Sequence, residues 1–223
     1  DVATHEVKDH SLERLQTQWK ESHSILGKYL DIYYIHSATK ESGVLDNTDV
    51  LQELFKLSQQ GILVGLTVSG KAQAETIQQA LKIKINNVPL FQCVQATWNL
   101  LEQSTTSILH NAHDQGVKVI IKEALANGRL TDRNNDPQFA EKRKILEEAT
   151  LRSGTSIDAI SIAVVLAQPW ADIVLSGAAT TEQLESNLTA LNVKFDLHNL
   201  KRLLSLAEPP ESYWNYRSSL PWN

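Results

Sequence analysis

The sequence contains no methionine and only one cysteine among its 223 residues. A single cysteine, Cys93, excludes a disulfide within the chain and suits a reducing compartment. Its place in the apolar run at residues 90–94 predicts a buried, unreactive thiol. The missing methionine, with Asp1 as the first residue, suggests a processed or excerpted polypeptide. We therefore expect a protein of the cytoplasm or of another reducing, soluble compartment.

Long apolar runs and an excess of basic charge are also absent. No apolar run approaches the roughly 20 residues that a membrane helix needs, and the first residues lack signal-peptide character. The formal net charge of -5 argues against a nucleic-acid surface, which needs clustered lysine and arginine. We expect no membrane and no nucleic-acid partner. Apolar residues at 42% and charged residues at 21% describe an ordinary globular protein.

Five short apolar runs set the organisation of the chain. They begin near residues 30, 62, 90, 117 and 171, and each is followed by a helical pattern. This rhythm is typical of repeated βα units that build a parallel sheet. We expect one α/β domain over residues 1–223, with a C-terminal tail at 209–223 lying over the surface. Helices are predicted at residues 11–26, 48–57, 72–81, 103–115, 137–152, 156–167, 180–191 and 197–206.

The run at residues 30–36 contains β-branched, aromatic and aliphatic side chains and ends at His36. Such a run predicts a strand buried on both faces. The C-terminal ends of parallel strands face the ligand crevice, so His36 is a candidate for catalysis. A hydrogen-bonded structural histidine is the alternative.

Five segments in this order and spacing resemble the aldo-keto reductases. They are residues 30–36 (LDIYYIH), 64–69 (VGLTVS), 94–101 (VQATWNLL), 125–130 (LANGRL) and 176–188 (SGAATTEQLESNL), so the resemblance covers essentially the whole chain. It implies a partial (β/α)8 TIM barrel of about five parallel strands, barrel strands 4–8, with flanking helices. It also implies that NADPH, with NADH as the alternative, binds at the C-terminal rim and reduces a small-molecule aldehyde or ketone.

The resemblance assigns three residues to the reacting end of the cofactor. His36 matches the histidine that donates a hydrogen bond to the substrate carbonyl, where negative charge develops. Ser69 and Gln95 match residues that hold the nicotinamide carboxamide, which needs both a donor and an acceptor. The family usually has asparagine where this chain has Gly70. A polar group satisfied inside the barrel is the alternative for Gln95.

The resemblance also assigns residues to the phosphates. Leu125, Asn127 and Gly128 match the loop that wraps the pyrophosphate, and small or turn-prone residues let a backbone approach an anion closely. Lys122 stands where many members carry an aromatic ring stacked on the nicotinamide. It is either a cation near the cofactor phosphates or a partner of Glu123.

The adenosine end is matched by Gly177, Gln183 and Asn187. The turn at residues 177–181 precedes a helix whose N-terminus offers N–H groups and a positive dipole to the 2'-phosphate of NADPH. Thr180 with Gln183 forms a capping-box pattern there. Family members often carry lysine or arginine in this segment, whereas Gly177 and Gln183 carry no charge. A preference for NADPH over NADH is therefore not secured by charge.

The catalytic aspartate, tyrosine and lysine of the family precede the helix at residues 11–26, so only His36 of the four groups falls within this sequence. Three explanations are open: a fragment of a complete reductase, a truncated relative that pairs its open sheet edges with another copy, or a non-catalytic nucleotide-binding or regulatory relative. We expect the first, because each retained segment is intact. No metal is expected, and His110 with His113 is interpreted as part of a solvated helix face.

Overall fold

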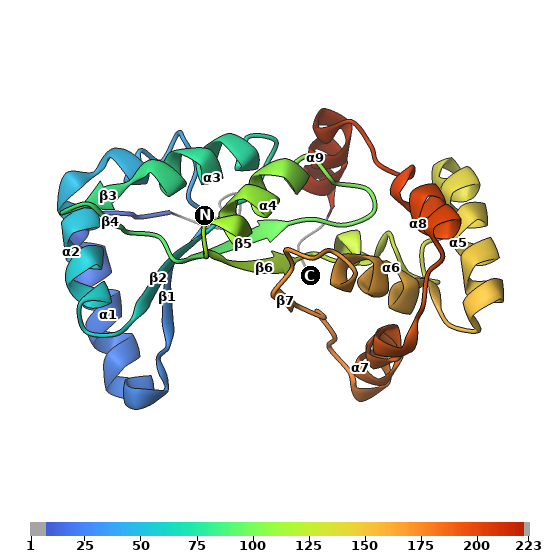
Figure 1. Cartoon of the computed structure of the whole chain (residues 1–223), viewed down its shortest axis with the longest axis horizontal. Coiled ribbons are helices and arrows are strands. Elements are labelled where there is room, and N and C mark those ends of the chain that lie inside the picture. The colour runs from blue at the N-terminus through green and yellow to red at the C-terminus, as the bar shows by residue number, and fades with distance from the viewer. Residues whose placement is uncertain (1–7, 221–223) are drawn as a thin grey trace. The chain divides into compact units, whose positions relative to one another are not determined.

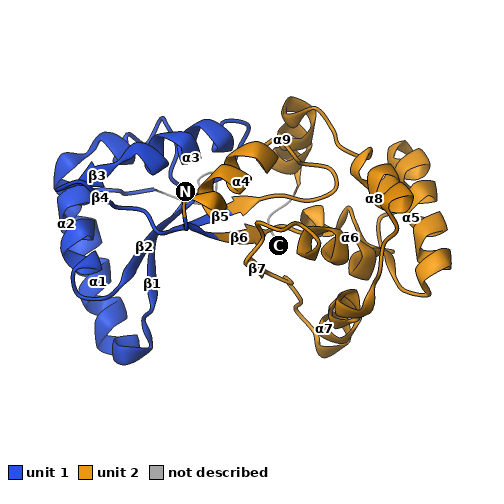
Figure 2. Ribbon diagram, viewed as in Figure 1, with its two compact units in different colours: residues 1–95, 116–118 blue, residues 96–115, 119–223 orange. Residues whose placement is uncertain are grey.

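The computed structural model describes residues 8–220 of the chain (Figure 1). The chain divides into two compact units, which Figure 2 colours separately. Unit 1 comprises residues 1–95 and 116–118, and unit 2 comprises residues 96–115 and 119–223. The single domain expected over residues 1–223 stays a prediction.

The elements alternate between helix and strand through most of the chain. The strands are β1 (Ile32–Ile35), β2 (Leu63–Thr67), β3 (Lys84–Ile85), β4 (Val88–Pro89), β5 (Cys93–Thr97), β6 (Lys118–Lys122) and β7 (Ile173–Val174). The α-helices are α1 (Leu12–Leu26), α2 (Thr48–Ser58), α3 (Gln73–Lys82), α4 (Thr106–Asp114), α5 (Ala140–Ser153), α6 (Ile157–Leu166), α7 (Thr181–Leu188), α8 (Leu197–Leu204) and α9 (Pro210–Ser219). Short 3-10 helices cover Gly27–Tyr29, Val44–Asp46, Ala126–Gly128, Pro137–Phe139 and Thr189–Asn192.

A five-stranded sheet has the order β1-β2-β5-β6-β7. β1 pairs with β2 in parallel, up to Ile35 opposite Leu66, and β2 pairs with β5 in parallel, up to Thr67 opposite Gln95. β6 also pairs with β7 in parallel, with Ile120 opposite Ile173 and Ile121 opposite Val174. The predicted α/β class with about five parallel strands and flanking helices is confirmed.

Three details of the sequence prediction are wrong. β1 is not buried on both faces, because three of its four residues are half-buried and it forms an edge of the sheet. The antiparallel hairpin of β3 and β4 was not predicted, and its turn residues Asn86 and Asn87 both take left-handed backbone angles, as asparagine tolerates in tight hairpins. The tail after residue 209 forms α9 and buries Tyr213, rather than only covering the surface.

The predicted helix starts have a local cause. Ser11 accepts a hydrogen bond from the Arg14 amide at 3.2 Å, and Ser156 accepts one from the Ala159 amide at 3.4 Å. Each serine thereby satisfies an amide that has no partner within the helix. Gly27 ends α1 with φ of 50°, a conformation that glycine adopts at low cost.

Each unit has its own buried apolar core. In unit 1, Leu54 of α2 and Val64 of β2 are fully buried, and the predicted burial of Cys93 is confirmed. In unit 2, the buried rings of Trp98 and Trp170 meet edge to face, 5.3 Å apart. Within residues 8–220, no single helix is long and apolar enough to cross a membrane; only the pair Pro137–Ser153 and Ile157–Leu166, bent by 85°, passes by length and composition.

Gly65 lies at a close approach inside unit 1. A Cβ atom at this position would lie 2.5 Å from Cε1 of Tyr34 and 3.0 Å from Cβ of Cys93. We expect Gly65→Ala to lower the free energy of unfolding by about 1–3 kcal/mol, the usual cost of overpacking a core. Urea denaturation measures the loss. In a Tyr34→Ala background the clash is relieved, so an equal loss in both backgrounds would contradict this explanation.

Candidate functional site

Unit 2 contains a cavity of about 650 Å³, a volume within the usual range for small-molecule sites. It lies between the loop that follows β6 and the start of α7, and Asp158 at the start of α6 also lines it. Seven residues assigned from the sequence line this one cavity: Lys122, Leu125, Asn127, Gly128, Gly177, Gln183 and Asn187. The segment at residues 122–133 and the segment at residues 175–187, more than 40 residues apart in the sequence, therefore contribute to a single site.

The loop after β6 has an unusual backbone. Glu123, Ala126 and Asn127 take φ values of 55°, 48° and 53°. These values lie in the left-handed region, which residues other than glycine rarely adopt. Gly128 follows with φ of 91°, and a Cβ atom built there would meet nothing within 4 Å. The backbone at Gly128 is thus open to the cavity, and the left-handed residues of the loop need support from their surroundings.

Hydrogen bonds hold the first end of the loop. Asn99 donates from Nδ2 to the Glu123 carbonyl oxygen at 2.9 Å and to the Tyr213 hydroxyl at 3.0 Å. Arg217 donates from Nε and Nη2 to the Glu123 carboxylate at 3.2 Å and 3.1 Å. Burial, with the nearby charge of Glu123, raises the pKa of Tyr213, so its hydroxyl stays neutral.

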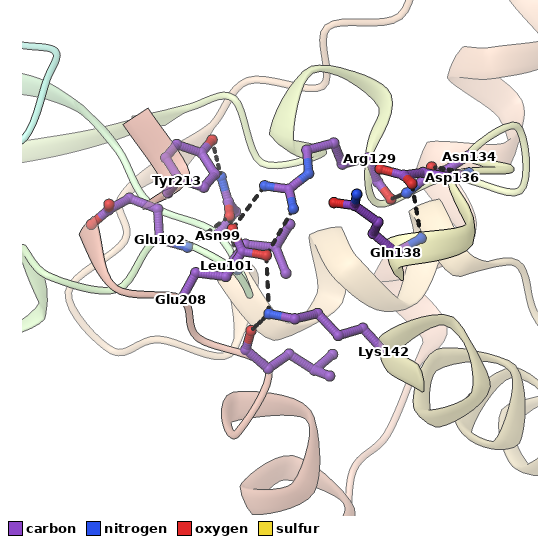
Figure 3. Close-up of polar contacts among 11 residues, drawn as sticks. Asn99, Leu101, Glu102, Arg129, Asn134, Asp136, Gln138, Lys142, Glu208 and Tyr213 are labelled. Atoms are coloured by element: carbon purple, nitrogen blue, oxygen red, sulfur yellow. Dashed lines mark hydrogen bonds and ion pairs between the residues drawn. The ribbon is translucent and has the colours of Figure 1, made fainter. Parts of the chain in front are cut away.

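An ion pair holds the other end of the loop (Figure 3). Arg129 meets the Glu208 carboxylate with two hydrogen bonds, 2.9 Å and 2.7 Å long, and both side chains are only 12–13% exposed. Lys142 adds a second cation 3.0 Å from Glu208, and the ring of Tyr216 lies 4.3 Å from the guanidinium carbon. Burial alone would raise the pKa of Glu208, but the hydrogen bonds from Arg129 and Lys142 outweigh it and hold this pKa below its ordinary value.

Sequence reasoning missed these supporting residues. Arg129 stood inside the segment used for the resemblance, but nothing in the sequence named Glu208 as its partner, 79 residues away. The one available signal in the sequence was the composition of residues 208–217. This segment contains acidic residues that can pair with an arginine and aromatic rings that can stack on it.

The start of α7 satisfies much of its own backbone. Thr180 accepts a hydrogen bond from the Gln183 amide at 3.3 Å, and the Gln183 side chain accepts one from the Ala179 amide at 2.8 Å. The capping role of Thr180 is confirmed, whereas Gln183 reaches Ala179 rather than the Thr180 amide of a capping box. Asn187, which is buried, donates to the Ser176 carbonyl at 3.2 Å and fixes the turn.

Charge is unevenly distributed around this cavity. Lys122 and Arg133 lie on the segment that begins with the end of β6, together with Glu123 and Asp132. On the side formed by α6 and α7, the charged lining residues are Asp158 and Glu182. The Glu182 carboxylate is bonded to its own amide and to the Thr180 hydroxyl, which lowers the pKa of Glu182. Arg133, Asp158 and Glu182 were not singled out from the sequence.

Unit 1 places His36 directly after β1, at the strand's C-terminal end, as predicted. His36 is exposed and lines a smaller cavity of about 260 Å³. Its carbonyl oxygen lies 2.8 Å from Nε2 of His10. The next residue, Ser37, has φ of 51°, and its amide donates to the Thr67 hydroxyl at 2.8 Å. This hydrogen bond to the end of β2 fixes the backbone of the turn that carries His36.

Ser69 and Gln95 also lie in unit 1. Ser69 follows β2 by two residues, and Gln95 lies in β5 opposite Thr67. The Val68 amide donates to the Gln95 carbonyl at 2.9 Å, so the end of β2 is tied to β5. Gly70 takes φ of 88°, which favours glycine over the family's usual asparagine. The linings of the two cavities described above include neither Ser69 nor Gln95.

The histidines of α4 have acidic neighbours. Nδ1 of His110 lies 2.9 Å from Asp114, and Nδ1 of His113 lies 3.4 Å from Asp172. The His110 side chain is exposed, and His113 is half-buried. In the part of the chain that the structure describes, no three or more histidine, cysteine, aspartate or glutamate side chains gather to hold a metal ion.

Glu208→Gln leaves the partly buried charges of Arg129 and Lys142 without their carboxylate. We expect it to lower the free energy of unfolding by about 3 kcal/mol at pH 7. Glu147→Gln, which breaks an exposed pair with Arg143, is the control and should cost less than about 1 kcal/mol. Urea denaturation of both variants compares the two losses.

The same pair predicts a pH dependence. Because the folded-state pKa of Glu208 is lowered from 4.5, its contribution is present above pH 4.5 and lost as the pH falls through the folded-state value. The difference in stability between wild type and Glu208→Gln should therefore shrink below pH 4.5. A difference that is constant from pH 7 to pH 3 would contradict the assigned ion pair.

Comparison with known proteins links these features to one family. The model of the aldo/keto reductase family matches residues 2–208 of this chain. Aldo-keto reductase YhdN of Bacillus subtilis is 26% identical over 204 residues, which cover 81% of this chain and 56% of that protein. L-glyceraldehyde 3-phosphate reductase of Escherichia coli is 26% identical over 191 residues, covering 74% of this chain and 54% of that protein. The chain spans about half the length of these curated relatives.

Solved structures show the same fold. The holo form of aldo-keto reductase AKR11C1 from Bacillus halodurans superposes with a TM-score of 0.73 at 18% identity, covering 93% of this chain and 70% of that one. The thermostable aldo-keto reductase Tm1743, solved with the inhibitor epalrestat, gives a TM-score of 0.65 at 21% identity, covering 87% and 66%. The expected partial (β/α)8 fold is thus confirmed. With the family match over residues 2–208, these findings show that the chain belongs to the aldo/keto reductase family.

Proposed function

We propose that this chain binds a reduced nicotinamide dinucleotide, NADPH or NADH, through the cavity of unit 2 and serves the reduction of an aldehyde or ketone to an alcohol. The observation that carries the proposal is the convergence of seven sequence-assigned residues on that cavity. Family membership supports the choice of ligand. When bound, the dinucleotide supplies the hydride for the carbonyl carbon.

The residues of the cavity suit a dinucleotide. The open backbone around Gly128 gives a phosphate room to approach, and Lys122 and Arg133 supply positive charge near it. Gly177, with φ of 64° and no atom within 4 Å of a Cβ built there, leaves similar room on the opposite segment. Asn187 offers a side-chain amide beside the same turn.

In this proposal His36 donates a hydrogen bond to the substrate. Its position after β1 allows the imidazole to donate to a carbonyl oxygen that gains negative charge as the carbonyl carbon is reduced. Ser69 and Gln95 are the proposed partners of the nicotinamide amide. Completion of the alcohol also needs a proton. A group other than His36, which only donates a hydrogen bond, must deliver it. A reducing compartment, and pairing of the open sheet edges with a second copy, stay predictions.

Arg133 provides the test of binding. We expect Arg133→Ala to weaken dinucleotide binding about three- to ten-fold, because a cation that lines the cavity is removed. Lys144→Ala, an exposed lysine of α5 outside the cavity lining, is the charge-matched control and should change nothing. Quenching of tryptophan fluorescence during titration measures the affinity. Equal affinities of the two variants would contradict the placement of the phosphates.

Turnover is a separate measurement. The chain is mixed with NADPH or NADH and a reactive aldehyde, and loss of the absorbance of the reduced nicotinamide is followed. Turnover that depends on His36, and falls in His36→Ala, is the expected result for the reductase. Dinucleotide binding without turnover would instead support a nucleotide-binding or regulatory role for the chain.

A further inference from the structure

The two sides of the unit 2 cavity differ in their charged residues. The segment from Lys122 to Arg133 carries both cations of the lining, and Glu123 and Asp132 on the same segment balance their charge. The side formed by α6 and α7 carries Asp158 and Glu182, and within the described residues of this lining it carries no cation. A ligand with a phosphate at one end and uncharged hydroxyls at the other matches this polarity better than a ligand with phosphates at both ends.

The start of α7 offers little to an added phosphate. The amides of Ala179 and Gln183 already donate to side chains of the same turn, at 2.8 Å and 3.3 Å. The exposed Glu182 carboxylate is hydrogen-bonded to its own amide and to the Thr180 hydroxyl, so this end of the helix already has a negative charge beside it. The negative charge of Glu182 therefore already compensates the positive end of the α7 dipole.

We infer that unit 2 discriminates against a 2'-phosphate and binds NADH in preference to NADPH, with Glu182 as the main determinant and Asp158 adding to it. The inference rests on the proposed function, in which the adenosine end lies near Gly177, Gln183 and Asn187. A ribose 2'-hydroxyl donates a hydrogen bond to a carboxylate, whereas a 2'-phosphate in the same place is repelled by it.

Calorimetric titration of the full chain with NADH and with NADPH tests the inference. We expect wild type to bind NADH at least about five-fold tighter. Glu182→Lys replaces the repelling charge by an attracting one, and it should shift the ratio of the two affinities toward NADPH by about ten-fold. Glu182→Gln should give a smaller shift in the same direction.

Glu185→Lys is the matched control. Glu185 is exposed on the same helix, one turn further on, and does not line the cavity, so this variant should leave the ratio near that of wild type. Raising the salt concentration to 1 M, where the Debye length is about 3 Å, should reduce the discrimination of wild type.

The outcomes separate the two proposals. Equal binding of both dinucleotides by wild type, or tighter binding of NADPH, would overturn the inference and leave the proposed function standing. An equal shift in Glu182→Lys and Glu185→Lys would overturn the role of Glu182. Binding of neither dinucleotide would contradict the proposed function, and the inference with it.

Discussion

The ion pair between Arg129 and Glu208 is the interaction on which the cavity of unit 2 depends. Its two hydrogen bonds join the end of the cavity loop to the segment that leads into α9, 79 residues further on. A carboxylate this well covered is stable only when its charge is matched, and Arg129 with Lys142 matches it. The rings of Phe139 and Tyr216 lie 5.6 Å and 4.3 Å from the guanidinium carbon and add a cation–π attraction.

Unit 1 also contains a strained turn, which fewer contacts hold in place. The turn after His36 has one left-handed residue, Ser37, and two hydrogen bonds to Thr67 hold it. Parallel pairing of β1, β2 and β5 brings the ends of these strands to the same edge, so the position of His36 follows from the sheet register. In unit 1 the site residues are placed by strands, whereas in unit 2 they are placed by side-chain contacts across a loop.

This contrast explains what the sequence could predict. Apolar runs and helical periodicity identified the five parallel strands and most helices, because burial in a parallel sheet imposes a strong local pattern. The hairpin at β3 and β4 was missed because its strands are two residues each. Seven of the nine residues assigned to the cofactor line one cavity, and Ser69 and Gln95 lie outside it in unit 1. Glu208, Tyr213 and Arg217 could not be assigned, since pairing over some 80 to 115 residues leaves no local pattern.

The strain of the cavity loop gives these distant contacts their importance. Left-handed backbone at Glu123, Ala126 and Asn127 costs roughly 1–2 kcal/mol for each residue. Burial of Ala124, Ala126 and Leu130 offsets part of this cost. The bonds to Asn99, Arg217 and Glu208 add to that offset. Two of these three partners lie in the segment of residues 208–217. Undocking of that segment would therefore remove two of the three contacts that hold the loop, so the stability of the cavity is coupled to that of α9.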